Sequence, residues 1–174
     1  LRVLGDPKKY AKSYYDDGAD EIIYHDVVAS LYQRNNILSL VKRTSENIFL
    51  PMVAGGGINN MKQVEEVLRS GADRVFINTG ALNNPKFIDQ IVKNFGSSTL
   101  VVSIEFVKLG NNYICRKDFG REETNIDLIS WAKEVQDRGA GELILTSIDK
   151  DGTGKGFDLN IAEKISKHLK IPFI

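Results

Sequence analysis

The sequence repeats itself at a shift of 121 residues, and this register constrains the fold more than any other feature. Tyr10 aligns with Trp131, and Leu50-Pro-Met-Val lies over Ile171-Pro-Phe-Ile. Eight further positions are identical: Asp6, Ala11, Lys12, Asp16, Gly18, Ala19, Glu21 and Ile23 meet Asp127, Ala132, Lys133, Asp137, Gly139, Ala140, Glu142 and Ile144. One register that joins a helix and two strands indicates two equivalent halves of one fold.

Helix and strand patterns alternate along the chain, and most of the strands are short apolar runs. Expected helices cover 6–17, 36–45, 60–69, 84–95, 125–138 and 158–168, and expected strands cover 21–26, 51–54, 74–78, 100–107 and 142–148, with one more from 171. Gly110-Asn-Asn is expected to turn the strand at 100–107 into a hairpin with 113–117. This alternation predicts an α/β fold with a parallel sheet covered by helices.

Four strand–helix units in each half predict a phosphate-binding (β/α)8 TIM barrel with a two-fold half-barrel repeat. Such a barrel takes about 250 residues, whereas the chain has 174. We therefore expect a single, partial barrel domain over 1–174 that lacks the first strand and ends after the start of the seventh. Open sheet edges would expose unpaired N–H and C=O groups, which predicts self-association into a homo-oligomer.

The composition limits the partners that we expect. Lys+Arg and Asp+Glu each number 23, so the formal net charge is zero, and neither nucleic acid nor an anionic membrane is an expected partner. The single cysteine, Cys115, excludes an internal disulfide and fits a cytoplasmic location. Apolar runs are far shorter than the roughly 20 residues of a membrane span. His and Cys residues do not cluster, so no metal site and no cofactor is expected.

A phosphate clamp is predicted where two strands end. Gly55-Gly56-Gly57 ends a strand and enters a helix, and glycine lets a phosphate approach backbone N–H groups. Asn78 and Thr79 end the next strand and add an amide and a hydroxyl. Because the active site of a barrel lies at the carboxyl ends of its strands, these residues are candidate phosphate ligands. The alternative is a tight turn that needs positive φ.

Three acids, Asp26, Glu105 and Asp151, lie at or near the same strand ends. They could act as general acid and base if their pKa values are pushed apart. Glu105 lies in an apolar strand in phase with Val101 and Ser103, and an acid that faces a barrel interior is costly unless it is used or paired. Asp26 could instead only bind loop amides, and Asp149-Lys-Asp-Gly-Thr could be only a turn.

The remaining titratable side chains of interest are expected to be structural. His25 should point towards the helices, and His168 lies near a helix end, where a surface role is the default. Cys115 has no evident activating partner. At the opposite ends of the strands, three charged residues each begin a strand: Glu21, Arg74 and Glu142, with Asp73 adjacent to Arg74. They could form a solvated rim, a docking face or a gate into the barrel.

Six segments, in order along the whole chain, together carry a family resemblance. They are Gly18-Ala-Asp-Glu, His25-Asp-Val-Val-Ala-Ser, Val53-Ala-Gly-Gly-Gly-Ile, Gly71-Ala-Asp-Arg-Val-Phe-Ile-Asn-Thr, Gly139-Ala-Gly-Glu and Leu145-Thr-Ser-Ile-Asp-Lys-Asp-Gly-Thr. These segments resemble the cyclase subunit of imidazole glycerol phosphate synthase. The resemblance implies a lyase of histidine biosynthesis. Ammonia from a glutaminase subunit would pass through the barrel and attack a phosphoribulosyl ribonucleotide, giving imidazole glycerol phosphate and an aminoimidazole carboxamide ribotide.

The resemblance also implies roles for individual residues. Gly57, Asn78 and Thr79 fall on one phosphate site, with Gly56 beside them. Asp26 matches an active-site carboxylate. Asp151, Gly152 and Thr153 fall on a substrate-binding loop, Glu21, Arg74 and Glu142 on a charged gate at the barrel base, and Asp73 on a glutaminase contact.

The sequence departs from the family pattern at the catalytic pair, which the resemblance implies to be two aspartates. One would lie on the absent first strand, and the other falls on Glu105, whose extra methylene moves the carboxylate by over an ångström. A displacement of that size can cost about 10²-fold in rate. The second phosphate site should lie beyond Ile174, so this chain alone is expected to be inactive.

Two relatives of the family remain alternatives. The segment Asp26-Val-Val-Ala-Ser-Leu-Tyr-Gln-Arg-Asn-Asn and the variant Ser103-Ile-Glu look closer to cyclase-like barrels that work with a glutaminase to amidate bacterial surface sugars. A two-phosphate isomerase shares the half-barrel repeat, but the charged base and the loop at Asp151 weigh against it.

Overall fold

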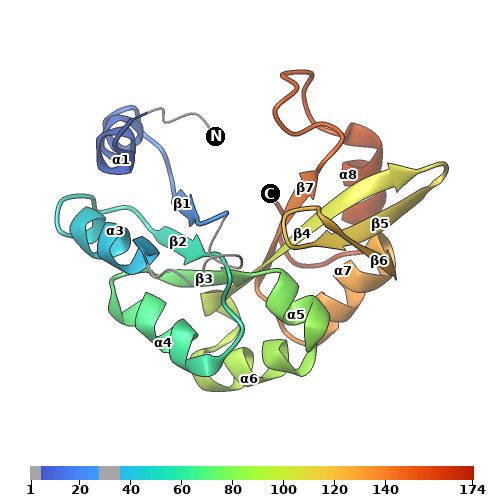
Figure 1. Cartoon of the computed structure of the whole chain (residues 1–174), viewed down its shortest axis with the longest axis horizontal. Helices are drawn as coiled ribbons and strands as arrows, with labels where there is room; N and C mark the ends of the chain where they lie inside the picture. Colours follow the sequence, from blue (N-terminus) through green and yellow to red (C-terminus); the bar gives the residue numbers. More distant parts are fainter. Residues whose placement is uncertain (1–4, 28–35) are drawn as a thin grey trace. The chain divides into compact units, whose positions relative to one another are not determined.

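The computed structural model describes residues 5–27 and 36–174 (Figure 1). The chain divides into two compact units, 1–76 and 77–174. The expectation of one domain over 1–174 stays a prediction. The end of the segment His25-Asp-Val-Val-Ala-Ser and most of the sugar-amidation-like segment lie outside the described residues.

The first unit is built on three parallel strands. Its elements are α1 (Pro7–Asp16), β1 (Ile22–His25), α3 (Asn36–Ser45), β2 (Met52–Gly55), α4 (Met61–Arg69) and β3 (Arg74–Ile77), whose last residue begins the second unit. β1 pairs with β2 from Ile22↔Met52 to His25↔Gly55, and β2 pairs with β3. Every residue of β2 is buried, as expected of a central parallel strand with apolar surroundings on both faces.

The second unit is built around the ten-residue strand β4. Its elements are α5 (Thr79–Asn83), α6 (Lys86–Phe95), the 3₁₀ helix η1 (Ser97–Thr99), β4 (Leu100–Leu109), β5 (Asn112–Lys117), β6 (Glu122–Asp127), α7 (Leu128–Asp137), β7 (Glu142–Ser147) and α8 (Leu159–Ser166). β4 pairs in parallel with β7 and forms the predicted antiparallel hairpin with β5, as Figure 1 shows. From Leu100 to Phe106, β4 is buried without interruption.

Packing in the second unit follows the sequence periodicity. Leu128, Trp131 and Val135 recur at helical spacing on α7 and are buried, and α7 contacts β4. Phe87, Ile88 and Ile91 do the same on α6. These faces position β4, and with it Glu105, inside the unit.

The 121-residue repeat is confirmed in the backbone of the two units. Ile22 N–H donates to Pro51 O at 3.0 Å, and Leu143 N–H donates to Pro172 O at 3.1 Å, which is the same bond shifted by 121 residues. The Asp6 and Asp127 side chains both cap the first turn of a helix. The α/β class and the parallel pairing are therefore confirmed, and they are compatible with a TIM barrel.

Two elements differ from the sequence-based expectation. The helix expected from Asn125 begins only at Leu128, because residues 122–127 form strand β6, which pairs antiparallel with β5. Asp127 is the residue that separates strand from helix, since its side chain accepts the Ser130 N–H at 2.9 Å. The short helix α5 was not expected, because five residues are too few to show a helical period.

The strand expected from residue 171 contains a single bridge, Leu143↔Phe173. In the described parts of the chain, none of the helices has the length and apolarity that crossing a membrane requires.

Candidate functional site

Glu105 is a buried carboxyl group at the centre of the second unit. Its residue is 6% exposed, and β4 holds it between Arg116 of β5 and Thr146 of β7. The Asn78 side chain and the Gly120 backbone hydrogen-bond to the carboxyl group, while Oε2 has no hydrogen-bond partner among the described residues. A buried oxygen without a partner is costly unless a ligand satisfies it. The expected burial of this acid is confirmed.

Burial raises the pKa of Glu105 above its ordinary value. The hydrogen bonds from Gly120 and Asn78 oppose this effect by favouring the ionised form, and the negative charges of Asp118 and Asp151 reinforce it. A carboxyl group with a raised pKa can both hold and release a proton closer to neutral pH than an ordinary glutamate.

The turn between β5 and β6 brings groups to Glu105 that the sequence did not predict. Asp118 and Phe119 have φ values of 49° and 60°, in the left-handed region that side chains rarely adopt. The Asp118 N–H donates to Thr79 Oγ1 at 3.0 Å, which ties the turn to the start of α5. Backbone strain of this kind, about 1–3 kcal/mol per residue, gathers at functional sites. The strained turn therefore adds Asp118 and Gly120 to the site.

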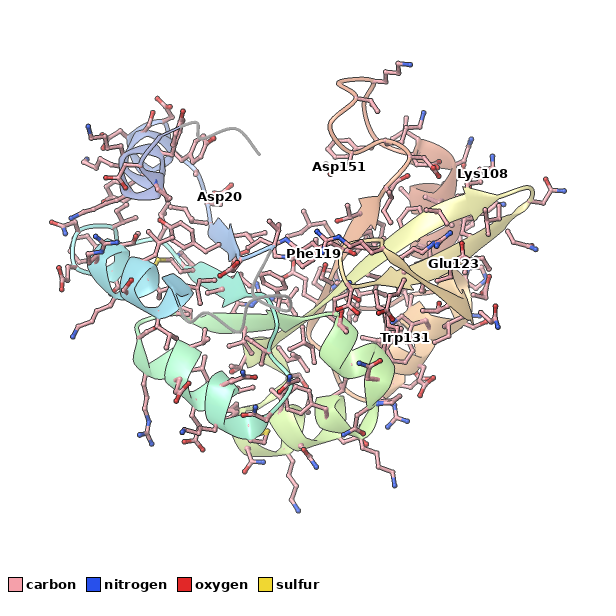
Figure 2. All side chains as sticks on the ribbon, in the orientation of Figure 1. Asp20, Lys108, Phe119, Glu123, Trp131 and Asp151 are labelled. Carbon is pink, nitrogen blue, oxygen red and sulfur yellow. The ribbon has the colours of Figure 1, made fainter. Side chains whose placement is uncertain are left out.

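The loop after β7 contributes Asp151, and Figure 2 shows Asp151 on this loop and Phe119 in the strained turn. Ser147 O accepts the Asp151 N–H at 2.9 Å, and Thr153 Oγ1 donates to Lys150 O at 2.7 Å. Gly152 has a φ of 69°. The turn foreseen as an alternative is thus present. Asp151 also acts electrostatically on Glu105, whereas Gly152 and Thr153 have no contact with it that the structure records.

The glycine loop lies in the first unit and shows close packing. Gly56 has a φ of 128° and Gly57 a φ of 66°. A Cβ added at Gly56 would clash with the backbone oxygen of Asp26, whose N–H donates to Gly55 O at 2.9 Å. Close packing in the fold is therefore enough to explain why this position requires glycine. A role in phosphate binding stays a prediction, and it involves Asn78 and Thr79 of the second unit.

The expectation that His25 points towards the helices is wrong. Ile22 and Tyr24 are the buried residues of β1, and the Tyr24 hydroxyl hydrogen-bonds to Thr44 Oγ1 of α3 at 2.9 Å. Because side chains alternate along a strand, His25 lies on the other face, where its ring meets Phe76 edge-on at 4.7 Å between centroids.

Comparison with known proteins identifies the family. Residues 1–174 match the family model described as "Histidine biosynthesis protein". The chain is 49% identical to imidazole glycerol phosphate synthase subunit HisF of Legionella pneumophila, over all of the chain and 82% of that relative. It is 43% identical to the subunits of the same name from Methanocaldococcus jannaschii and Cytophaga hutchinsonii, over all of the chain and 71% and 69% of their lengths. The chain belongs to the HisF family.

The basal charges of this HisF-family chain form a pair in the first unit. Arg74 Nη1 lies 3.1 Å from Glu21 Oε1, and both side chains are 21% exposed. Glu142, in the second unit, is buried at the start of β7. At 21% exposure this pair is only partly in contact with solvent, and the rim, docking-face and gate interpretations all stay predictions.

Asp73 has a structural contact in addition to its predicted role as a partner contact. Its Oδ2 accepts the Met52 N–H at 2.8 Å, at the start of β2. Asp73→Ala should therefore lower the free energy of unfolding by about 1–3 kcal/mol, because the Met52 N–H loses its acceptor. Asp73→Asn keeps an acceptor oxygen and should lose much less. Urea denaturation of both variants measures this, and equal stability of Asp73→Ala and the unmodified protein would contradict the structural role.

The two remaining titratable candidates are Cys115 and His168. Cys115 is fully buried on β5, and burial together with the charge of Asp127 raises its pKa to about 12, so it stays a thiol. His168 is exposed near the end of α8, where its Nδ1 contacts Lys164 O at 2.7 Å. Residues 5–27 and 36–174 contain no cluster of His, Cys, Asp and Glu side chains that could hold a metal ion.

Proposed function

We propose that the protein is the cyclase subunit of an imidazole glycerol phosphate synthase. In this proposal it uses ammonia from a glutaminase partner on a phosphoribulosyl ribonucleotide. The observation that supports it most is Glu105, a buried carboxyl group with a raised pKa and an oxygen without a partner, in a chain of the HisF family.

The chemistry requires a group that moves protons in both directions. Attack of ammonia on a carbonyl carbon forms a C–N bond and releases a proton from nitrogen, and loss of the carbonyl oxygen as water takes up a proton. Glu105 can accept the first proton on Oε2 and supply the second, since its raised pKa allows both forms. Asn78 holds the carboxyl group in one orientation through its hydrogen bond.

The other residues support binding in this proposal. Gly56, Gly57, Asn78 and Thr79 bind a substrate phosphate, and Asp26 and the loop with Asp151, Gly152 and Thr153 bind the rest of the substrate. Glu21, Asp73, Arg74 and Glu142 form the face that receives the glutaminase and its ammonia.

Turnover of the ribonucleotide with ammonium salts, assayed in the full-length parent protein, tests the proposal. We expect release of imidazole glycerol phosphate that depends on ammonia and does not require glutamine. A folded protein that gives no turnover at any ammonia concentration would contradict the proposed cyclase function.

A second candidate function is amidation of a bacterial surface sugar by a cyclase-like subunit. Glu105 favours it, because the family pattern implies an aspartate at this position. In that case Glu105→Asp should not raise turnover of the histidine intermediate, whereas a weakened cyclase should gain activity from the shorter side chain.

The pH dependence of the reaction tests the electrostatic role of the strained turn. The negative charge of Asp118 raises the pKa of Glu105, so Asp118→Asn removes a cause of the upward shift. The limb of the kcat/KM profile that reports Glu105 should move to lower pH. Asp137→Asn, at an exposed position at the end of α7, is the matched control and should leave the profile in place. An unmoved limb in Asp118→Asn would show that its charge does not reach Glu105.

A further inference from the structure

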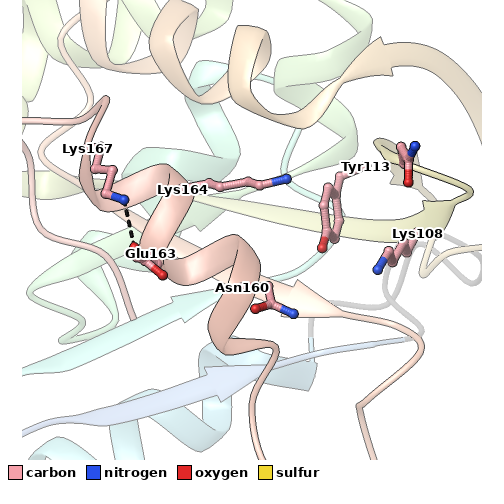
Figure 3. Close-up of a pocket in the computed structure, with 7 residues that line it drawn as sticks. Lys108, Tyr113, Asn160, Glu163, Lys164 and Lys167 are labelled. Atoms are coloured by element: carbon pink, nitrogen blue, oxygen red, sulfur yellow. Dashed lines mark hydrogen bonds and ion pairs between the residues drawn. The ribbon is translucent and has the colours of Figure 1, made fainter.

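A polar pocket lies in the second unit, and Glu105 is not among its lining residues. It has a volume of about 450 Å³ and is lined by Lys108, Asn111, Tyr113, Asn160, Glu163, Lys164 and Lys167. These residues come from the β4–β5 hairpin and from α8, as Figure 3 shows. None of them belongs to the candidate functional site.

The pocket is built around one fixed aromatic ring. Tyr113 is 5% exposed and packs edge-on against Phe106, with 5.9 Å between ring centroids. Lys108 Nζ lies 5.8 Å and Lys164 Nζ 5.6 Å from the centroid of the Tyr113 ring. Figure 3 shows the ring between the two lysine side chains. Cation–π attraction therefore favours the placement of both ammonium groups beside this ring.

The positive charge of the pocket is not neutralised by its own lining. Glu163 is the one carboxylate among the lining residues, and it pairs with Lys167 at 2.6 Å. Lys108 and Lys164 have no carboxylate within ion-pair distance among the residues that the structure describes. The two ammonium groups lie on different sides of the ring, and each attracts an anion that reaches it.

The size and lining favour a small phosphorylated molecule. A volume of about 450 Å³ is that of a small-molecule site. Lysine binds phosphate as a point charge, and the amides of Asn111 and Asn160 can donate to further oxygens. Tyr113 is 5% exposed, so its ring offers no free face on which a nucleobase could stack. We propose that this pocket binds the phosphate groups of a small metabolite through Lys108 and Lys164.

Site-resolved chemical modification with inorganic pyrophosphate as the probe tests the proposal. Lysines are acylated with and without pyrophosphate, against sodium chloride at equal ionic strength, and each position is quantified by peptide mass spectrometry. Acylation of Lys108 and Lys164 should fall about tenfold on saturation, whereas Lys133, exposed on α7, should react equally in all samples. Equal protection of Lys133, or no protection of Lys108 and Lys164, overturns the proposal.

Variants give a second readout that does not depend on the proposed phosphate site at Asn78 and Thr79. In calorimetric titrations with pyrophosphate, Lys108→Gln and Lys164→Gln should each weaken one class of binding site about tenfold, and Lys133→Gln should not. Both lysines are exposed, so the variants should fold normally. Unchanged pyrophosphate affinities in the two variants would contradict phosphate binding in this pocket, even if pyrophosphate binds elsewhere on the protein. The pyrophosphate titrations remain informative even if the protein shows no cyclase activity.

Discussion

Replacing Glu105 by glutamine should strongly lower the rate of ammonia-dependent turnover and at the same time stabilise the protein. Glutamine keeps the shape of the side chain and can still hydrogen-bond to Asn78 and Gly120, but it cannot exchange a carboxyl proton. Because general acid–base catalysis contributes about 10²–10⁴-fold, kcat should fall by a factor of that order, with a smaller effect on KM.

The gain in stability in Glu105→Gln should depend on pH, and the direction follows from the pKa. In the folded protein the pKa of Glu105 is raised above its unfolded value. Such a group contributes stability that is fully present below the unfolded pKa and is lost as the pH rises through the folded pKa. Glutamine does not titrate, so the variant escapes this loss.

Thermal unfolding measured below and well above the ordinary pKa of a glutamate should show this. The two proteins should differ little at acidic pH, and the variant should gain in Tm as the pH rises. Glu46→Gln, at an exposed position, is the control and should show no such trend. A variant with full activity, or a difference in Tm that does not change with pH, would contradict the role assigned to Glu105.

The features that the sequence predicted are those with local signals. The helices expected over 6–17 and 158–168 start at Asp6 and Asp158, and both aspartates cap their helices in the structure. The phase of Glu105 with Val101 and Ser103 predicted its burial, because side chains two apart share a face of a strand. The repeat register predicted that the hydrogen bond from Ile22 N–H to Pro51 O recurs 121 residues later, between Leu143 N–H and Pro172 O.

The features that the sequence did not predict depend on contacts between distant residues. β6 exists because residues 122–127 pair with β5, and nothing in their own polar sequence favours a strand over a helix. The approach of Asp118 to Glu105 depends on a left-handed turn that Thr79 holds from 39 positions away in the sequence. The contact of Asp73 with Met52 is likewise invisible without the pairing of β2 and β3.

Replacing Gly56 by alanine should strongly destabilise the first unit. Two effects add at this position. The φ of 128° is strained for any L side chain, and a Cβ would clash with the backbone oxygen of Asp26, which the hydrogen bond from Asp26 N–H to Gly55 O holds in place. Backbone strain and forced overpacking together should lower the free energy of unfolding by about 2–5 kcal/mol.

Gly18→Ala separates the two effects, because Gly18 also has a positive φ, 85°, but has open space where a Cβ would lie. Its loss should come from backbone strain alone and should be the smaller one in urea denaturation. Equal losses in the two variants would mean that Asp26 does not pack against Gly56.

The same comparison decides how activity data on the glycine loop must be interpreted. If Gly56→Ala unfolds the loop, its lost turnover reports the packing of β1 on β2 and not a missing phosphate contact. Phosphate binding then has to be tested at Asn78, whose side-chain NH2 group can donate to a phosphate oxygen.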